Sequence, residues 1–213
     1  ALAPPRDAAL HLGLDDVDEA LTHLASSLMP RFPEVSADAV TGVVRESYAG
    51  LARTARITAH LVPLTERFAR QRLSDLTRDR AAGAPQVLFV CVANAGRSQL
   101  AAALVQQISQ GRVVARSAGS SPAAAVHPTV RPLLAAIDDA AESEAFPKPL
   151  TDDAVRAADV VVTMGCGDVC PIIPGVRYED WAVGDPALAS AEGVAAIRDD
   201  IAQRVERLVA ELV

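Results

Sequence analysis

The chain has 213 residues, half of them hydrophobic and only 3% aromatic, and a formal net charge of −7. This length suits one ordinary domain and a smaller one, with cores filled mainly by Ala, Val and Leu. The negative charge argues against nucleic acid as the main partner. No apolar run reaches 18 residues and the first residues do not resemble a signal peptide, so we expect no membrane span. Three cysteines, an odd number, are typical of reduced thiols in a cytoplasm.

Residues 1–80 predict a bundle of three helices. Apolar residues recur at intervals of three and four over 14–30, which is typical of a helix with one buried face. Ser36 suits the N-cap of a second helix, and a third is expected from about Thr58 to Asp79, with Pro63 in its first turn. Five large side chains of the third helix should point inward, namely Leu61, Leu64, Phe68, Leu73 and Leu76. Amphipathic helices with short connections favour a bundle, and residues 81–85 are the expected linker.

The pattern changes over residues 86–213, where short apolar strands alternate with helices. We expect strands within 86–91, 112–119, 158–164 and 176–183, and helices within 97–110, 128–140, 151–157 and 190–212. This alternation predicts an α/β domain with a parallel sheet that helices cover on both faces. Ligands of such sheets bind at the carboxyl ends of the strands. Cys91 ends the first strand, so we expect the functional site there.

The segment that follows Cys91 predicts a loop that binds an oxyanion. A loop between a strand and a helix N-terminus directs backbone N–H groups into one cavity, where the helix dipole favours negative charge. Asn94 and Gly96 tolerate the left-handed backbone of such a loop, and Arg97 offers a planar fork for two oxygens. The same surroundings favour the thiolate of Cys91, to which Ser98 can donate a hydrogen bond. The expected oxyanion-binding residues are Val92, Ala93, Asn94, Ala95, Gly96, Arg97 and Ser98.

The stretch "VLFVCVANAGRSQLA" resembles the active-site loop of the low-molecular-weight protein tyrosine phosphatases, and more narrowly that of the arsenate reductases built on the same fold. Gln99 follows Arg97 and Ser98 as in those reductases, where the phosphatases have Pro. Further motifs follow in family order: "SAG" at 117–119, "HP" at 127–128, "VVTMGC" at 161–166, "CPIIPGV" at 170–176 and "DWAVGDPA" at 180–187. The resemblance covers residues 86–213 and implies a four-stranded parallel sheet flanked by helices. Gly96 stands where many members have Cys, and the helical residues 1–80 lie outside the common domain.

Cys166 and Cys170 distinguish between the two activities, because reducing arsenate requires two electrons and therefore two thiols. A spacing of four places them one turn apart on a helix, within reach of a disulfide after local adjustment. The alternative is that both are small buried hydrophobic residues. Zinc is less favoured, because the spacing is not C-x2-C and the sequence offers no evident fourth ligand. We therefore expect no bound metal or cofactor.

The resemblance implies a thioredoxin-coupled relay that detoxifies arsenic. In it, Cys91 attacks arsenic, and Asp185, which precedes Pro186, protonates the leaving oxygen. Cys166 then attacks Cys91, Cys170 takes over the disulfide, and thioredoxin as electron donor resets it. If Asp185 only forms a turn, or if Cys166 and Cys170 are dispensable, this relay fails.

Three alternatives stay open at this point: a protein tyrosine phosphatase, a reductase that uses a low-molecular-weight thiol, and a non-catalytic oxyanion sensor. Ala187 and Leu188 follow Pro186 and offer no aromatic ring to clamp a phosphotyrosine, which favours a small oxyanion. Trp181 is expected in the core beside the site. For the helical domain we expect either a homodimer interface or a cover over the cleft.

Overall fold

The computed structural model of the chain describes residues 14–56, 60–165 and 170–213. The chain divides into two compact units, Ala1–Thr77 and Arg78–Val213, and each has a hydrophobic core of its own. Within the described residues, no helix has both the length and the apolar character that a membrane crossing requires.

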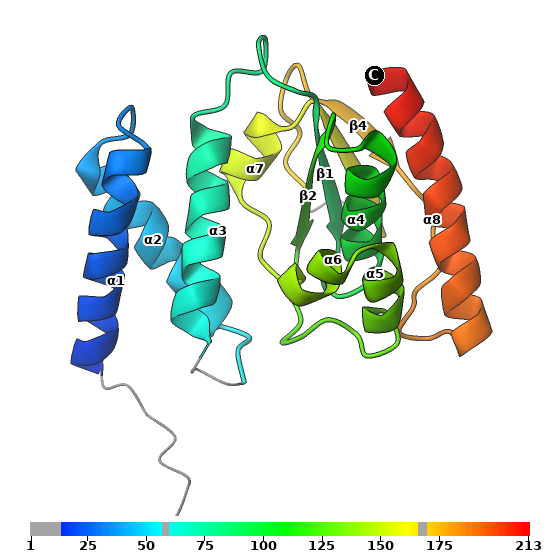
Figure 1. The fold of residues 1–213 in the computed structure, drawn as a ribbon, viewed down its shortest axis with the longest axis horizontal. Helices are drawn as coiled ribbons and strands as arrows, with labels where there is room; N and C mark the ends of the chain where they lie inside the picture. Colours follow the sequence, from blue (N-terminus) through cyan, green and yellow to red (C-terminus); the bar gives the residue numbers. More distant parts are fainter. Residues whose placement is uncertain (1–13, 57–59, 166–169) are drawn as a thin grey trace, which may run out of the picture. The chain divides into compact units, whose positions relative to one another are not determined.

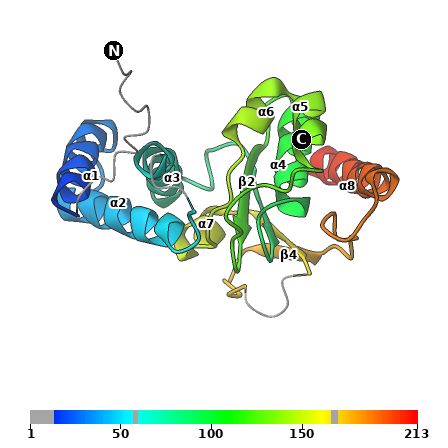
Figure 2. The ribbon, with the colours of Figure 1, turned by 90° about the horizontal axis from the view of Figure 1, so that it is seen from below.

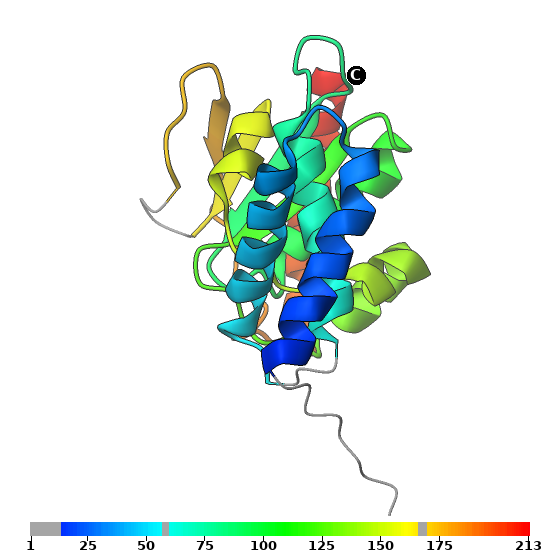
Figure 3. The same ribbon diagram turned by 90° about the vertical axis from the view of Figure 1, so that its left-hand side faces the viewer.

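The first unit contains three helices that lie side by side, α1 (Leu14–Leu28), α2 (Ala37–Ala52) and α3 (Leu61–Leu76) (Figure 3). The predicted three-helix bundle is confirmed, with one addition. A short 3-10 helix, Met29–Arg31, follows α1, because Pro30 has no N–H group with which to continue an α-helix. The expected N-cap is also confirmed, since the Ser36 hydroxyl accepts a hydrogen bond from the backbone N–H of Ala39 at 3.3 Å.

The core of this unit is built from Leu and Val side chains of α1 and α2, which pack against Ala69 and Leu73 of α3. The prediction that Leu76 points inward is wrong, because its side chain is 51% exposed. The third helix ends at Leu76 instead of continuing to Asp79, so this leucine sits in the terminal turn. Arg72 is buried in its place and pairs with Glu46 of α2 at 3.0 Å.

The second unit is built on a parallel four-stranded sheet of order β2–β1–β3–β4, as predicted. The strands are β1 (Gln86–Cys91), β2 (Val114–Gly119), β3 (Val160–Met164) and β4 (Arg177–Asp180). Because β1 lies between two neighbours and is buried along its whole length, its end lies in the middle of the sheet edge. Cys91 therefore occupies the centre of the edge at which a site is expected.

In the described part of this unit, five helices surround the sheet: α4 (Arg97–Ser109), α5 (Arg131–Ile137), α6 (Asp139–Glu144), α7 (Asp152–Ala157) and α8 (Ala191–Leu212). Helices α4, α5 and α8 lie on one face and α7 lies on the other (Figures 1 and 2). The single helix predicted over 128–140 is two helices. Asp138 interrupts it with an extended backbone, and its carboxylate caps α6 by accepting from the N–H of Ala140 at 3.0 Å.

The position of Cys91 along β1 determines the face of the sheet to which its side chain points. Successive side chains of a strand point to opposite faces. Phe89 and Cys91 pack into the core beneath α4 and α8, whereas Leu88 and Val90 pack into the core beneath α7. The sulfur of Cys91 therefore lies on the side from which α4 begins.

The segment that leads into β1 is anchored to the sheet unit by two arginines. The carboxylate of Asp159 accepts a hydrogen bond from Arg78 Nη2 at 2.7 Å and from the backbone N–H of Gln86 at 2.8 Å. Arg80 Nη2 donates to the carbonyl of Gly175 at 2.6 Å and its Nε also approaches Asp159. The residues just before the expected linker 81–85 are thus held by ionic hydrogen bonds, which are the stronger kind.

Candidate functional site

Cys91 is the last residue of β1, and its side chain is almost completely buried, at 2% exposure. Its Sγ atom lies 3.0 Å from the Oγ atom of Ser98, in the first turn of α4. The chain between them turns through residues 92–96 before the helix begins at Arg97. The thiol is therefore held at the N-terminus of α4.

The loop turns its carbonyl groups away from the helix axis. Four of these carbonyl groups accept hydrogen bonds from backbone N–H groups of the segment after β2. Ser120 donates to Cys91, Ser121 to Val92, Ala123 to Ala93 and His127 to Ala95. Among the residues that the structure describes, none accepts a hydrogen bond from the N–H groups of residues 92–96. The first N–H groups of a helix also have no partner within it. This arrangement leaves a set of donors suited to an oxyanion.

Asn94 is the residue that shapes the loop. Its φ of 47° places it in the left-handed region, as predicted, and its side chain is fully buried. Its Nδ2 atom donates to Ser98 Oγ at 2.9 Å, and its Oδ1 atom accepts from the N–H of Lys148 at 2.9 Å. Because the Ser98 oxygen accepts from Asn94, its own proton is free to point at the sulfur of Cys91.

Gly96 has a different role from the one predicted. Its φ is −152°, so the left-handed conformation that we expected at this position is absent. What matters is the missing side chain, because a Cβ atom would lie 3.2 Å from Cγ of Pro186 and 3.5 Å from Cδ2 of His127. Gly96 therefore lets the Asp185–Pro186 segment and the turn at His127 approach the loop.

Gln99, which the sequence marks as typical of the reductases, ties the loop to a distant segment. Its Nε2 atom donates to the carbonyl of Asn94 at 3.0 Å and to the carbonyl of Phe146 at 2.9 Å. A proline at this position would lose both bonds. The segment 146–149, with the buried side chain of Lys148, is thereby attached to the loop at two points.

Arg97 and Asp185 meet across the mouth of the site. Arg97 is the first residue of α4, and its Nη2 atom lies 3.2 Å from Oδ2 of Asp185, in the segment after β4. The other carboxylate oxygen of Asp185 accepts from the N–H of Ala187 at 3.0 Å, which fixes the orientation of the group. The structure thus brings Asp185, from the segment after β4, to the loop segment that contains both Cys91 and Arg97.

The other two cysteines do not join this group in the part of the chain that is described. Cys166 lies outside the described residues. Cys170 is partly buried and packs with Ile173 and Tyr178 against the core beneath α7. Cys91 packs into the core on the opposite face of the sheet.

Two glycines contribute to the site in a way that the sequence did not reveal. Gly119 ends β2, and a Cβ atom there would lie 2.8 Å from the carbonyl oxygen of Val92 and 3.0 Å from the N–H of Asn94. Gly165 follows β3 with a φ of 71°, and its Cβ atom would lie 3.0 Å from Nη1 of Arg97. The available signal was that both glycines directly end strands that lie beside β1.

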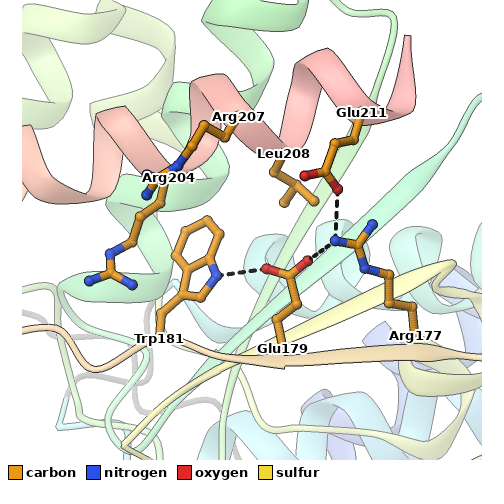
Figure 4. A pocket seen from close by; sticks show the side chains of 7 residues that line it. All are labelled: Arg177, Glu179, Trp181, Arg204, Arg207, Leu208 and Glu211. Carbon is orange, nitrogen blue, oxygen red and sulfur yellow. Dashed lines mark hydrogen bonds and ion pairs between the residues drawn. The ribbon is translucent and has the colours of Figure 1, made fainter.

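A pocket of about 230 Å³ lies apart from this loop, between β4 and α8 (Figure 4). Three of its charged side chains pair with one another: Arg177 contacts both Glu179 and Glu211, and the hydrogen bond to Glu211 raises the pKa of Arg177. Trp181 is 5% exposed, as expected for a core residue, and donates from Nε1 to Glu179 at 2.8 Å. Its ring packs at 5.7 Å from that of Phe89, so this region supports β1 and offers no reactive group.

No group of three or more His, Cys, Asp or Glu side chains that could hold a metal ion occurs among the described residues.

Two family models match the chain. The N-terminal domain of protein-tyrosine-phosphatase-like proteins matches residues 21–77, and the low molecular weight phosphotyrosine protein phosphatase model matches residues 86–213. The fold is similar to that of a thioredoxin-dependent arsenate reductase from Corynebacterium glutamicum, with a TM-score of 0.80 and 43% identity over 91% of this chain and 96% of that one.

Two further relatives match the sheet unit. A candidate arsenate reductase from Halobacterium salinarum is 37% identical over 128 residues, which are 58% of this chain and 89% of that protein. The glutaredoxin arsenate reductase of Synechocystis is 30% identical over 132 residues, 60% of this chain and 98% of that protein.

Proposed function

Because the chain belongs to the low molecular weight phosphotyrosine protein phosphatase family, we propose that it is an arsenate reductase that detoxifies arsenic with electrons from thioredoxin. The observation that carries the proposal is the group formed by the Cys91 sulfur, the Ser98 hydroxyl and the Arg97–Asp185 pair around a loop of N–H donors. The similarity to a thioredoxin-dependent arsenate reductase along nearly the whole chain supports the same activity.

In the first step the thiolate of Cys91 attacks arsenic in the loop. An S–As bond forms, the bond from arsenic to the leaving oxygen breaks, and Asp185 supplies the proton with which that oxygen departs as water. The donors of residues 92–98 and the guanidinium of Arg97 hold the remaining oxygens and stabilise the charge that they carry in the transition state. The Ser98 hydroxyl, oriented by Asn94, stabilises the attacking thiolate.

The second step removes arsenic by a disulfide relay. The thiolate of Cys166 attacks the Cys91 sulfur, the S–As electron pair stays on arsenic, and As(V) leaves as arsenite, As(III). Cys170 then attacks Cys166 and frees Cys91, so that the disulfide joins Cys166 and Cys170. A thioredoxin dithiol reduces that disulfide and becomes oxidised in turn. The chain needs no resident metal or cofactor for any of these steps.

Phosphatase activity is the second candidate, because Cys91, Arg97 and Asp185 suffice for it. The residues that follow Pro186 argue against an aryl phosphate. The segment after Pro186 presents Ala187 and Leu188, and the leucine side chain is 89% exposed, so no ring is available for stacking. A low-molecular-weight thiol as electron donor is a further variant, in which Cys166 and Cys170 are dispensable.

Counting thiols after a single turnover tests the proposal. The full chain has three cysteines, and arsenate without any reductant should oxidise two of them, leaving one thiol for a chromogenic reagent. Phosphate should oxidise none. Three thiols remaining after arsenate, together with rapid hydrolysis of an aryl phosphate, would favour the phosphatase.

The helical unit is proposed as the contact of a homodimer. Its family model is separate from the one that matches residues 86–213, and the described residues of its helices hold no metal-binding group of three or more His, Cys, Asp or Glu side chains. Light scattering should give twice the chain mass for the full chain and a single chain mass for residues 78–213. If both chains have the same oligomeric state, either the dimer contact lies outside the helical unit or the chain forms no dimer.

A further inference from the structure

Ile172 has one of the two most exposed large hydrophobic side chains among the described residues, at 85%. It follows Cys170 by two positions, in the segment that leads to β4. The sequence from Cys170 to Val176, "CPIIPGV", contains no charged residue. An exposed apolar side chain is unremarkable when it is mobile and isolated, so the question is what holds this one in place.

The phenol of Tyr178 holds the backbone on both sides of Ile172. Its hydroxyl donates to the carbonyl of Pro171 at 2.7 Å and accepts from the N–H of Ile173 at 2.9 Å. Tyr178 belongs to β4, so the clasp is part of the sheet. The two residues that bracket Ile172 are therefore fixed, and its side chain cannot turn inward without breaking both hydrogen bonds.

Other apolar residues of the same segment pack inward. Ile173, Val176 and Cys170 are partly buried and pack against the core beneath α7. The carbonyl of Gly175 accepts a hydrogen bond from Arg80, which fixes the far end of the segment. Pro171, Pro174 and Gly175 are exposed as well, but Ile172 is the large hydrophobic side chain that this uncharged segment presents outward, two positions after Cys170.

We propose that Ile172, with Pro171, is the contact on which a protein dithiol reductant docks to attack the sulfur of Cys170. This rests on the proposed function, which makes Cys170 one half of the disulfide that is reset in each cycle. A thiolate of the reductant attacks Cys170, the bond between Cys170 and Cys166 breaks, and Cys166 leaves as a thiolate that takes up a proton. The second thiol of the reductant then attacks the mixed disulfide, which releases Cys170 and leaves the reductant as a disulfide.

The chemistry favours a protein over a small hydrophilic thiol. Contact with a rigidly held isoleucine stabilises a complex only if the partner buries it under an apolar surface of its own. A small thiol offers no such surface, and its rate would not depend on Ile172. Tyr178 acts as a positioning residue, since it reaches the partner only through the backbone that it holds.

The test uses the full chain oxidised with diamide, so that arsenate is not needed and a failure of arsenate reduction leaves the test intact. Mass spectrometry verifies the Cys166–Cys170 disulfide. The rate at which thioredoxin reduces this disulfide is then measured at a series of thioredoxin concentrations. Ile172→Ala should raise the thioredoxin concentration for half-maximal rate by about five- to thirty-fold, and Tyr178→Phe should raise it by a smaller factor. Reduction by dithiothreitol should be the same in all variants.

Leu188→Ala is the matched control, because Leu188 is equally exposed, at 89%, but lies in the segment after Pro186. It should leave the thioredoxin dependence unchanged. An unchanged dependence in Ile172→Ala, or an equal rise in Leu188→Ala, would overturn the proposal. So would a protein in which diamide leaves Cys166 and Cys170 as thiols, because a reductant would then have no disulfide to attack.

Discussion

Gly165 leaves the space that the guanidinium of Arg97 occupies: a Cβ atom on Gly165 would lie 3.0 Å from Nη1 of Arg97. On its other side, Nη2 of the same guanidinium lies 3.2 Å from the carboxylate of Asp185. The end of β3 and the segment after β4 therefore confine the arginine from two directions. Its position relative to Cys91 depends on a residue that takes no part in the chemistry.

Gly165→Ala should weaken anion binding by ten-fold or more, because the new methyl group displaces Arg97. Calorimetric titration with phosphate measures this. Gly175→Ala is the control, since Gly175 has a φ of 81° but no atom within 4 Å of the added Cβ. Both variants should lose about 1–2 kcal/mol of stability from the left-handed backbone, while only Gly165→Ala loses affinity. Equal affinities would show that Arg97 adapts.

Ser98→Ala should slow alkylation of Cys91 by about ten-fold or more at neutral pH. The thiolate loses the donor at 3.0 Å, and a hydrogen bond to a charged group contributes about 1.5–3 kcal/mol. Mass spectrometry of the Cys91 peptide after iodoacetamide treatment measures the rate. Ser109→Ala, which removes a buried serine at the other end of α4, should leave that rate unchanged. A wild-type rate in Ser98→Ala would mean that other donors hold the thiolate.

Asp185→Asn should slow the first step by about 10²- to 10⁴-fold, the usual contribution of a general acid. Stopped-flow measurement of arsenate-driven thiol loss follows this step without thioredoxin. Asp180→Asn offers a nearby control, because Asp180 accepts from Thr163 Oγ1 at 2.6 Å at the end of β4 and serves no catalytic role in our proposal. If Asp185→Asn reacts within two-fold of wild type, another group supplies the proton.

A fragment of residues 86–213 should be less stable than a fragment of residues 78–213 by about 1–3 kcal/mol, measured by urea unfolding. The shorter fragment lacks Arg78, whose guanidinium pairs with Asp159 at 2.7 Å and is only 10% exposed. In the longer fragment, Arg78→Ala should reproduce most of this loss of stability. Arg131→Ala removes an exposed pair with Glu142 and should cost under 1 kcal/mol. Equal unfolding midpoints for the two fragments would remove Arg78 from this role.

Patterns of local origin were predictable from the sequence. The strand "QVLFVC" is observed with the expected bounds because its residues after Gln86 are all apolar, and Ser36 caps α2 because that preference is intrinsic to the residue. The break at Asp138 was not predicted, since an aspartate caps a new helix only where the backbone before it becomes extended.

Within the site, the sequence predicted which polar groups lie together and the left-handed backbone at Asn94, but not the positions at which a missing side chain makes room. Cys91, Arg97 and Asp185 carry recognisable chemistry. Gly96, Gly119 and Gly165 act through absent side chains, so their roles depend on which atoms approach from other parts of the fold. The link from Gln99 to Phe146 joins residues far apart in the chain, and no local pattern reveals such a bond.

In our proposal the three cysteines act as one relay, and Cys170→Ser is the variant that separates this relay from a mechanism without Cys170. The measurement is arsenate-dependent NADPH consumption by the full chain with thioredoxin and thioredoxin reductase. The relay predicts that Cys170→Ser abolishes sustained consumption, as Cys91→Ser and Cys166→Ser should, while a single arsenate-driven Cys91–Cys166 disulfide still forms. Full thioredoxin-linked turnover in Cys170→Ser would contradict the relay.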